Sequence, residues 1–125
     1  MNAEKIAFNP QARIEQFFES NVRNVWIMEV PASYYLRKSQ RIFNDRFIPC
    51  LDIANVQVNP EYRHRGYFTA ILLAAETVSC QRGYRVYIEN LFPQPFDMEG
   101  FLLRRGYVKF TFTELPCFYY SGTPV

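Results

Sequence analysis

The chain has 125 residues, of which 49% are hydrophobic and 21% charged, and its formal net charge is +2. This composition fits one globular domain, residues 1–125, and excludes an intrinsically disordered chain. A charge of +2 is too small to indicate nucleic-acid binding by itself. The N-terminus lacks the apolar core of a signal peptide and no apolar run approaches membrane-spanning length, so we expect a soluble, cytoplasmic protein.

Three cysteines, Cys50, Cys80 and Cys117, are odd in number and lack the spacing of metal ligands. Each lies in an apolar stretch, which predicts three buried, reduced thiols and a reducing compartment. We expect no metal site.

The first predicted helix begins at Asn9-Pro10, since proline is tolerated in the first turn of a helix. Ile14, Phe17 and Phe18 follow at helical spacing and predict one apolar face. A short apolar stretch before it, residues 6–8, is a possible first strand.

Three β-type runs come next, at residues 24–30, 33–43 and 50–58. Asn44-Asp45 supplies a turn between the second and third runs, and Pro49 limits where the third begins. The connections between them are short and polar, which predicts an antiparallel meander.

The second half of the chain predicts a βαβ unit. Residues 67–81 have helical apolar spacing, Gly83 stands just past the helix end, and residues 84–91 form a strand that should be parallel to 50–58. A short helix at 96–105, ended by Gly106, and two further strands at 107–113 and 117–121 complete the prediction.

The loop between the third strand and the second helix reads Arg63-His64-Arg65-Gly66-Tyr67-Phe68. A helix start leaves several backbone N–H groups without intrahelical partners, and together with the positive end of the helix dipole they suit an anion, most often a phosphate. The alternative is an ordinary strand-to-helix turn with exposed arginines.

Two stretches resemble the GCN5-related N-acetyltransferase (GNAT) family. Residues 58–69, VNPEYRHRGYFT, are similar to the acyl-CoA loop of that family, V-x-P-x-[YF]-[QR]-x-x-G-x-[GA], with Arg63 and Gly66 at the matching places and Phe68 where Gly or Ala is usual. Residues 101–107, FLLRRGY, are similar to its F-Y-x-x-x-G-F segment, with Leu102 in place of the tyrosine. The element order fits over nearly the whole chain, and residues 84–106 also look like small phage-encoded members.

This resemblance implies an α+β (α/β-type) fold, in which helices flank a mixed, mostly antiparallel sheet with a central βαβ acyl-CoA unit. It also implies an acetyl-CoA-dependent N-acetyltransferase that acts on a primary amine by direct transfer in a ternary complex. The two strands of the βαβ unit should separate near the loop, with Asn55 suited to a bulge there. The residues expected to bind acetyl-CoA are Val56, Gln57, Val58, Arg63, His64, Arg65, Gly66, Tyr67, Phe68 and Thr69.

Candidate catalytic residues follow from the same resemblance. The base that takes the ammonium proton is Asp52 or Glu89, with Glu29 as a third choice, although each carboxylate has the alternative of facing solvent. Because Leu102 replaces the usual tyrosine, the thiolate would be protonated by Tyr119, Tyr107 or water.

Other functions stay open. A GNAT-fold module without catalytic activity, bound to a protein or nucleic acid, is one alternative, and acyl transfer onto a modified nucleic-acid base is another. The basic residues around the predicted hairpin would suit nucleic acid: Arg37, Lys38, Arg41 and Arg46. The aromatic C-terminal strands are a possible homodimer surface.

Overall fold

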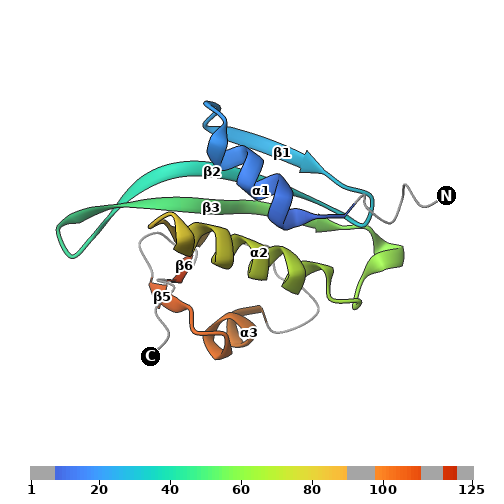
Figure 1. The fold of residues 1–125 in the computed structure, drawn as a ribbon. Coiled ribbons are helices and arrows are strands. Elements are labelled where there is room, and N and C mark those ends of the chain that lie inside the picture. Colours follow the sequence, from blue (N-terminus) through green and yellow to red (C-terminus); the bar gives the residue numbers. More distant parts are fainter. Residues whose placement is uncertain (1–7, 90–97, 111–116, 121–125) are drawn as a thin grey trace.

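The computed structural model describes residues 8–89, 98–110 and 117–120, and Figure 1 shows their arrangement. The elements are α1 (Pro10–Glu19), β1 (Asn24–Met28), β2 (Ala32–Phe43), β3 (Arg46–Val58), the 3₁₀ turn η2 (Pro60–Tyr62), α2 (Tyr67–Gln81), β4 (Arg85–Glu89), α3 (Met98–Arg104), β5 (Val108–Phe110) and β6 (Cys117–Tyr120).

The strands form one six-stranded sheet in the order β1-β2-β3-β4-β6-β5. β3 and β4 are parallel, with Cys50–Ile53 paired to Arg85–Ile88, and every other neighbouring pair is antiparallel. The antiparallel meander and the βαβ unit are therefore confirmed, and the fold is the mixed α+β arrangement that the sequence predicts.

Local sequence signals account for the helix boundaries. Asn9 caps α1, its side-chain oxygen accepting from the Ala12 N–H at 3.2 Å, and Pro10 occupies the first turn. α2 ends at Gln81, and Gly83 follows with φ of +75°, a backbone conformation that glycine adopts without strain. The first two predicted helices are confirmed, and α3 confirms the third within the described residues, whereas the possible strand at 6–8 lies outside the described residues except for Phe8, which is not in a strand.

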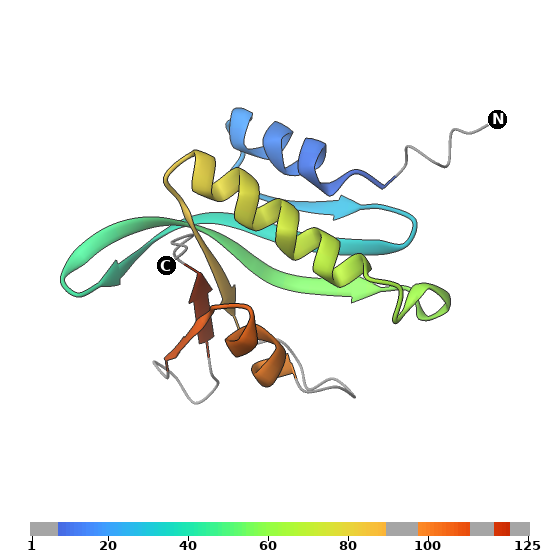
Figure 2. The ribbon, with the colours of Figure 1, turned by 60° about the horizontal axis from the view of Figure 1, so that its bottom comes forward.

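The two faces of the sheet differ. Helices α1 and α2 lie side by side on one face (Figures 1 and 2), where Ile14, Ile71, Leu51 and Ile88 belong to one buried core. Leu102 of α3 joins the same core. The opposite face has a smaller buried cluster of Cys50, Tyr87 and Cys117, with Phe43 and Tyr119 packed against it and no residue from a described helix. Side chains on this second face therefore lie on the side away from α1 and α2.

Two predictions about single residues are wrong. β3 begins at Arg46 and runs through Pro49, because among the described strands only β2 flanks it there, β4 joining at Cys50. A residue at such an edge can lack an N–H without losing a ladder bond. Cys80 is exposed rather than buried, because it lies on the outer side of α2, next to the buried Ser79. Cys50 and Cys117 are buried free thiols, as predicted.

The remaining boundary predictions extend into residues that the structure does not describe, namely 90–91, 96–97, 111–113 and 121. Within the described residues, no helix combines the length and hydrophobicity needed to span a membrane.

Candidate functional site

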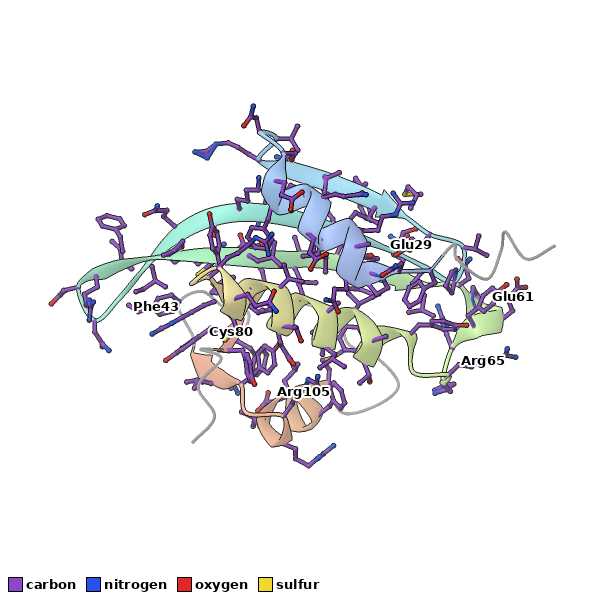
Figure 3. All side chains as sticks on the ribbon, in the orientation of Figure 1. Glu29, Phe43, Glu61, Arg65, Cys80 and Arg105 are labelled. Carbon is purple, nitrogen blue, oxygen red and sulfur yellow. The ribbon has the colours of Figure 1, made fainter. Side chains whose placement is uncertain are left out.

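The loop before α2 lies at one end of the molecule, beyond the end of β3 (Figure 1), and β4 runs parallel to β3. Arg65 projects from the loop, at the opposite end of α2 from Cys80 (Figure 3). The backbone N–H groups of Tyr67, Phe68 and Thr69 have no hydrogen-bond acceptor among the described residues. The first hydrogen bond of the helix runs from the Ala70 N–H to the Gly66 carbonyl, at 2.9 Å. Three N–H donors and the positive end of a 15-residue helix therefore face one space.

Gly66 has a left-handed backbone with φ of +84° and caps α2 without a side-chain hydrogen bond. A Cβ built there meets no atom within 4 Å, so the space in front of the loop is open. His64 also has positive φ, +63°, which turns the chain sharply before the helix. This geometry allows a ligand to approach the backbone closely.

The cationic side chains of the loop lie at its edges. Arg63 folds back, and its Nε donates to the Val58 carbonyl at 3.3 Å. Arg65 lies 5.9 Å from the centre of the Tyr62 ring, which in turn meets Tyr67 edge to face at 5.8 Å. The aromatic rings therefore support the loop, Arg63 is held against β3, and Arg65 lies beside Tyr62.

Phe68, where the GNAT pattern has a small residue, points into the protein. Its ring lies 6.0 Å from that of Phe101 on α3, and it packs against the main core. The unusual residue is therefore used for helix packing, and the backbone N–H groups stay on the other side of the turn.

Among the described residues, β3 pairs with β4 only over the middle of β3. The last paired residues are Ile53 and Ile88, and the described register stops there. On the β2 side the register shifts between Tyr35 and Leu36, which leaves Ala54 as the extra residue of a bulge. The bulge adjoins Asn55, as the sequence predicts, and Val56, Gln57 and Val58 follow it on β3, beyond the last described pair with β4.

Asp52 lies on β3 with no exposed surface. Its Oδ1 accepts from Ser39 Oγ at 2.8 Å and Arg41 Nε at 3.3 Å, and its Oδ2 accepts from Arg41 Nη2 at 2.8 Å. A carboxylate held by a two-point guanidinium contact has little capacity left to take a substrate proton. These contacts favour a structural role for Asp52, in which it holds Ser39 and Arg41, over the role of catalytic base.

Glu89 is the last residue of β4 and directly follows the final β3–β4 pair. Arg37 Nη2 bonds its Oε1, and Arg41 Nη2 lies 3.8 Å from its Oε2. The side chain is 34% exposed. Of the two carboxylates on this face, Glu89 is the one that an outside amine can reach.

The structure does not bring the other predicted catalytic residues to this point. Tyr119 pairs with Tyr87, two residues back along β4, and its ring contacts Phe43 at 4.7 Å and the Arg85 guanidinium at 5.2 Å. Glu29 is buried and accepts from Tyr34 Oη and the Asn9 N–H. Burial, with this hydrogen bond, raises the pKa of Tyr34 well above its usual value. Glu29 therefore ties α1 to the β1–β2 turn.

A second charged cluster was not predicted. Glu76 of α2 is buried and accepts from Arg105 Nε and Nη2 and from Tyr107 Oη, all at 2.8 Å. Burial, with the charge of Glu76, raises the pKa of Tyr107 far above the ordinary value, so this hydroxyl is a structural donor and no general acid. The available signal was a glutamate on the apolar side of a helix, directly after Ala75.

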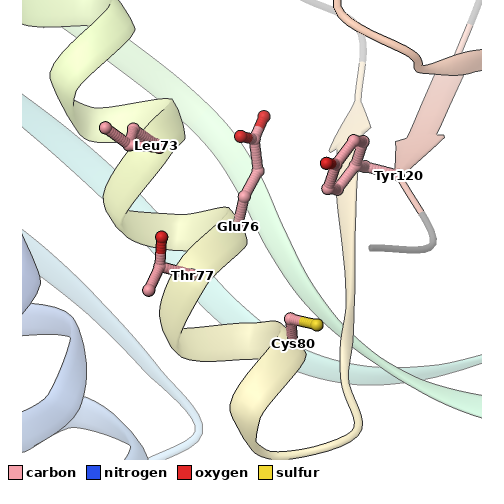
Figure 4. A pocket seen from close by; sticks show the side chains of 5 residues that line it. All are labelled: Leu73, Glu76, Thr77, Cys80 and Tyr120. Carbon is pink, nitrogen blue, oxygen red and sulfur yellow. The ribbon is translucent and has the colours of Figure 1, made fainter. Parts of the chain in front are cut away.

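A shallow hollow of about 190 Å³ lies beside this cluster, lined by Leu73, Glu76, Thr77, Cys80 and Tyr120 (Figure 4). Its residues come from the middle and C-terminal end of α2 and from β6. The hollow therefore lies away from the N–H donors that begin α2. Among the described residues, no group of three or more His, Cys, Asp or Glu side chains is placed to hold a metal ion.

No protein-family model and no curated protein sequence matches the chain. Solved structures do. A complex of KacTA with DNA matches with a TM-score of 0.58 at 13% identity, over 75% of this chain and 60% of the other. A tyrosine-to-phenylalanine mutant of the toxin AtaT, bound to the C-terminus of the antitoxin AtaR and to acetyl-CoA, matches with a TM-score of 0.54 at 12% identity, over 74% and 59%. A tyrosine-to-phenylalanine mutant of KacT matches with a TM-score of 0.55 at 10% identity, over 98% and 92%.

The chain spans about three fifths of the length of the first two neighbours. KacT and AtaT are acetyltransferases of the GNAT fold, and at such low identity the likeness establishes the fold alone. The resemblance to phage-encoded members stays a prediction. On its architecture and on these neighbours, the chain has a GNAT-like fold.

Proposed function

We propose that this protein is an acetyl-CoA-dependent N-acetyltransferase that transfers an acetyl group to a primary amine by direct transfer in a ternary complex. One observation carries the proposal: the N–H groups that begin α2 have no acceptor among the described residues, and they follow the carboxyl end of β3, which runs parallel to β4. In open sheets with parallel strands, ligands bind at the carboxyl ends of the strands, at such a point.

The residues at this end fit coenzyme A. The N–H groups of Tyr67, Phe68 and Thr69 suit the pyrophosphate, Gly66 leaves open space for it, and Arg63 and Arg65, on either side of His64, supply positive charge. The edge of β3 at Val56, Gln57 and Val58, which has no partner on the β4 side among the described residues, suits the amide groups of the pantetheine arm. A bound acetyl-CoA supplies an activated acyl thioester.

Glu89 is the base in this proposal. Its partly exposed carboxylate directly follows the last described β3–β4 pair and accepts a proton from the acceptor ammonium, which leaves the amine free to attack. Arg41, fixed on Asp52 and 3.7 Å above the Tyr87 ring, limits where Glu89 can lie. Since Leu102 is fully buried and Tyr119 is held by Phe43 and Arg85, water protonates the leaving thiolate.

Two glycines make the decisive experiment possible. Gly66 and Gly83 stand at opposite ends of α2, both have positive φ, and a Cβ at either meets no atom within 4 Å. Gly66→Trp and Gly83→Trp therefore impose similar backbone strain but place the new ring at different ends.

Calorimetric titration with acetyl-CoA and coenzyme A should show micromolar binding to the wild type and to Gly83→Trp, and none to folded Gly66→Trp. No binding to the wild type would refute the proposal. Equal binding of acetyl-CoA to both variants would show that the loop does not form part of the binding site.

A second candidate function is a GNAT-fold module that binds a protein or nucleic acid without catalysis. Leu102, in place of the usual tyrosine and fully buried, favours it, and solved neighbours include complexes with an antitoxin and with DNA. Acetyl-CoA binding without acetyl transfer to any amine would support this candidate over the enzyme.

A further inference from the structure

Arg37 and Glu89 form an exposed pair of opposite charges at the proposed reaction point. Arg37 extends from β2 across β3, and its Nη2 bonds Oε1 of Glu89 at the end of β4. Both side chains are 34% exposed. An ion pair that is open to solvent contributes little to stability, typically below about 1 kcal/mol, so a ligand can replace it without disrupting the fold.

The other charges of this face do not need a ligand. Arg41 contacts both oxygens of Asp52, and its guanidinium carbon lies 3.7 Å from the centre of the Tyr87 ring. Ser39 donates to the same carboxylate at 2.8 Å. Arg37 reaches Asp52 only at 3.4 Å. Asp52 and Arg41 therefore satisfy each other, and the Arg37–Glu89 pair is the part of the cluster that faces outward.

Two aromatic residues lie on the same face of the sheet as the pair. Tyr35 precedes Arg37 by two residues in β2 and so points to the same side, and Trp26 of β1 is its direct cross-strand partner. The two rings have centroids 5.2 Å apart, and Trp26 is 44% exposed. The carboxylate of Glu89 on β4, the guanidinium of Arg37 on β2 and the aromatic pair on β2 and β1 thus lie on one face of the sheet.

We propose that the acceptor is a free α-amino acid with an aromatic or large aliphatic side chain. The proposal rests on the proposed function and names its substrate class. The α-ammonium group binds Glu89, the α-carboxylate binds the planar fork of Arg37, and the side chain lies toward Tyr35 and Trp26. The zwitterion and the Arg37–Glu89 pair are both neutral, so one internal ion pair is exchanged for two with the ligand. An amine without an adjacent anion leaves Arg37 on Glu89, where it competes for the base.

The transfer is balanced in atoms and charge. The ammonium proton goes to Glu89, the amine nitrogen forms a bond to the acetyl carbonyl carbon, and the carbon–sulfur bond breaks. The second proton of the attacking nitrogen leaves to water, and water protonates the thiolate. The products are an N-acetyl amino acid and coenzyme A.

The test compares amino acids with their amides. L-Phenylalanine, L-tryptophan, L-leucine and L-methionine are each paired with the carboxamide of the same amino acid, and kcat/KM is measured with saturating acetyl-CoA. The amides are the less basic amines and have more free amine at neutral pH, so a preference for the acids runs against intrinsic reactivity. We expect at least one acid to exceed its amide by about tenfold to a hundredfold, the usual effect of a charged hydrogen bond.

Arg37→Gln should bring that ratio close to one, chiefly by raising KM for the acid. Arg46→Gln, on the same hairpin but at its exposed tip, should leave the ratio unchanged. Calorimetric titration of the preferred acid in the presence of coenzyme A adds a readout without turnover, and binding should be lost in Arg37→Gln alone.

The outcomes separate this inference from the proposed function. Amides acetylated as well as all four acids, or better, would overturn the amino-acid acceptor and leave the acetyltransferase standing. Failure of the wild type to bind acetyl-CoA would overturn both. If Arg37→Gln does not fold, the wild-type ratio of acid to amide decides the question without it.

Discussion

At the scale of single residues, two carboxylates on one face of the sheet have different surroundings. Asp52 is fully buried and saturated by Ser39 and Arg41, whereas Glu89 is half-exposed at the end of a strand. The first arrangement suits a structural anchor and the second a group that exchanges protons with a ligand.

Glu89→Gln should lower kcat for acetyl transfer by about 10²- to 10⁴-fold, the usual contribution of a general base. The substitution keeps the shape of the side chain, and Glu89 is not among the groups assigned to coenzyme A, so acetyl-CoA affinity should stay within about twofold. Steady-state kinetics and calorimetry measure the two effects. Unchanged kcat would exclude Glu89 as the base.

Asp52→Asn should act on stability instead. The substitution replaces the carboxylate that contacts Arg41 at two points with a neutral, buried amide. Breaking such a buried pair costs about 3 kcal/mol or more. Urea unfolding followed by circular dichroism measures the loss. A change below about 1 kcal/mol would show that Asp52 is not the anchor of this face.

Burial raises the pKa of the Cys50 thiol from 9.0 to about 12, with the charge of Asp52 adding to the effect. Between these two values the unfolded chain loses this proton and the native chain keeps it, so the free energy of unfolding falls as pH rises from about 9 toward 12. The expected loss is about 1.4 kcal/mol for each pH unit.

Urea unfolding at pH 8 and 10.5 checks this prediction, because Cys50→Ala should show a smaller fall in stability than the wild type. Cys80→Ala is the matched control, since Cys80 is exposed, and it should retain the full fall. Identical pH dependence of all three proteins would contradict the assignment.

At the scale of elements, α2 has two separate tasks. Its first turn presents the N–H groups of the loop, and its middle fixes the C-terminal part of the fold through Glu76, which holds Arg105 and Tyr107 beyond α3. Phe68, in the first turn of α2, adds a ring contact with Phe101 of α3. The position of α3 is therefore set by side chains of α2.

Glu76→Ala should destabilise the protein by about 3 kcal/mol, because it leaves Arg105 and the buried Tyr107 hydroxyl without their acceptor. Glu99→Ala is the control: Glu99 pairs with Lys109 at 3.1 Å on the surface, where such pairs are worth less than about 1 kcal/mol. Similar losses in both variants, measured by urea unfolding, would contradict a special role for Glu76.

At the scale of the whole molecule, much of the positive charge is used internally. Arg37 and Arg41 face Asp52 and Glu89, and Lys38 donates to the Ser20 carbonyl and lies 4.6 Å from the Phe17 ring centre. Of the basic residues predicted to form a nucleic-acid surface on the β2–β3 hairpin, only Arg46 has no contact of this kind among the described residues. The hairpin is therefore less basic than its sequence indicates.

Binding of the protein to a random DNA duplex should accordingly depend weakly on salt, with few phosphates neutralised. Anisotropy measurements between 50 and 200 mM salt give the slope of log Kobs against log salt. Arg63→Ala and Arg65→Ala, in the loop, should reduce that slope by about one each, and Arg37→Ala should not. A slope lowered by Arg37→Ala would restore the hairpin as a nucleic-acid surface.

The sequence by itself determined the elements and the loop. Asn9-Pro10, the apolar spacing of residues 67–81 and Gly83 act within a few residues of the helix ends that they define, so they can be read without the fold. Gly66 and the bulge next to Asn55 belong to the same class of local signal. Pro49 led to a wrong start for β3, because whether a strand can contain proline depends on which strands flank that position.

Only the tertiary structure decided which charges meet. Arg37 and Glu89 are 52 residues apart in the chain, and Glu76 and Arg105 are 29 apart. Such pairs depend on strand order, register and the angle of helix packing, which periodicity does not specify. For this reason the loop was identified from sequence, whereas the burial of Asp52, the exposure of Glu89 and the pairing of Arg37 came from the fold.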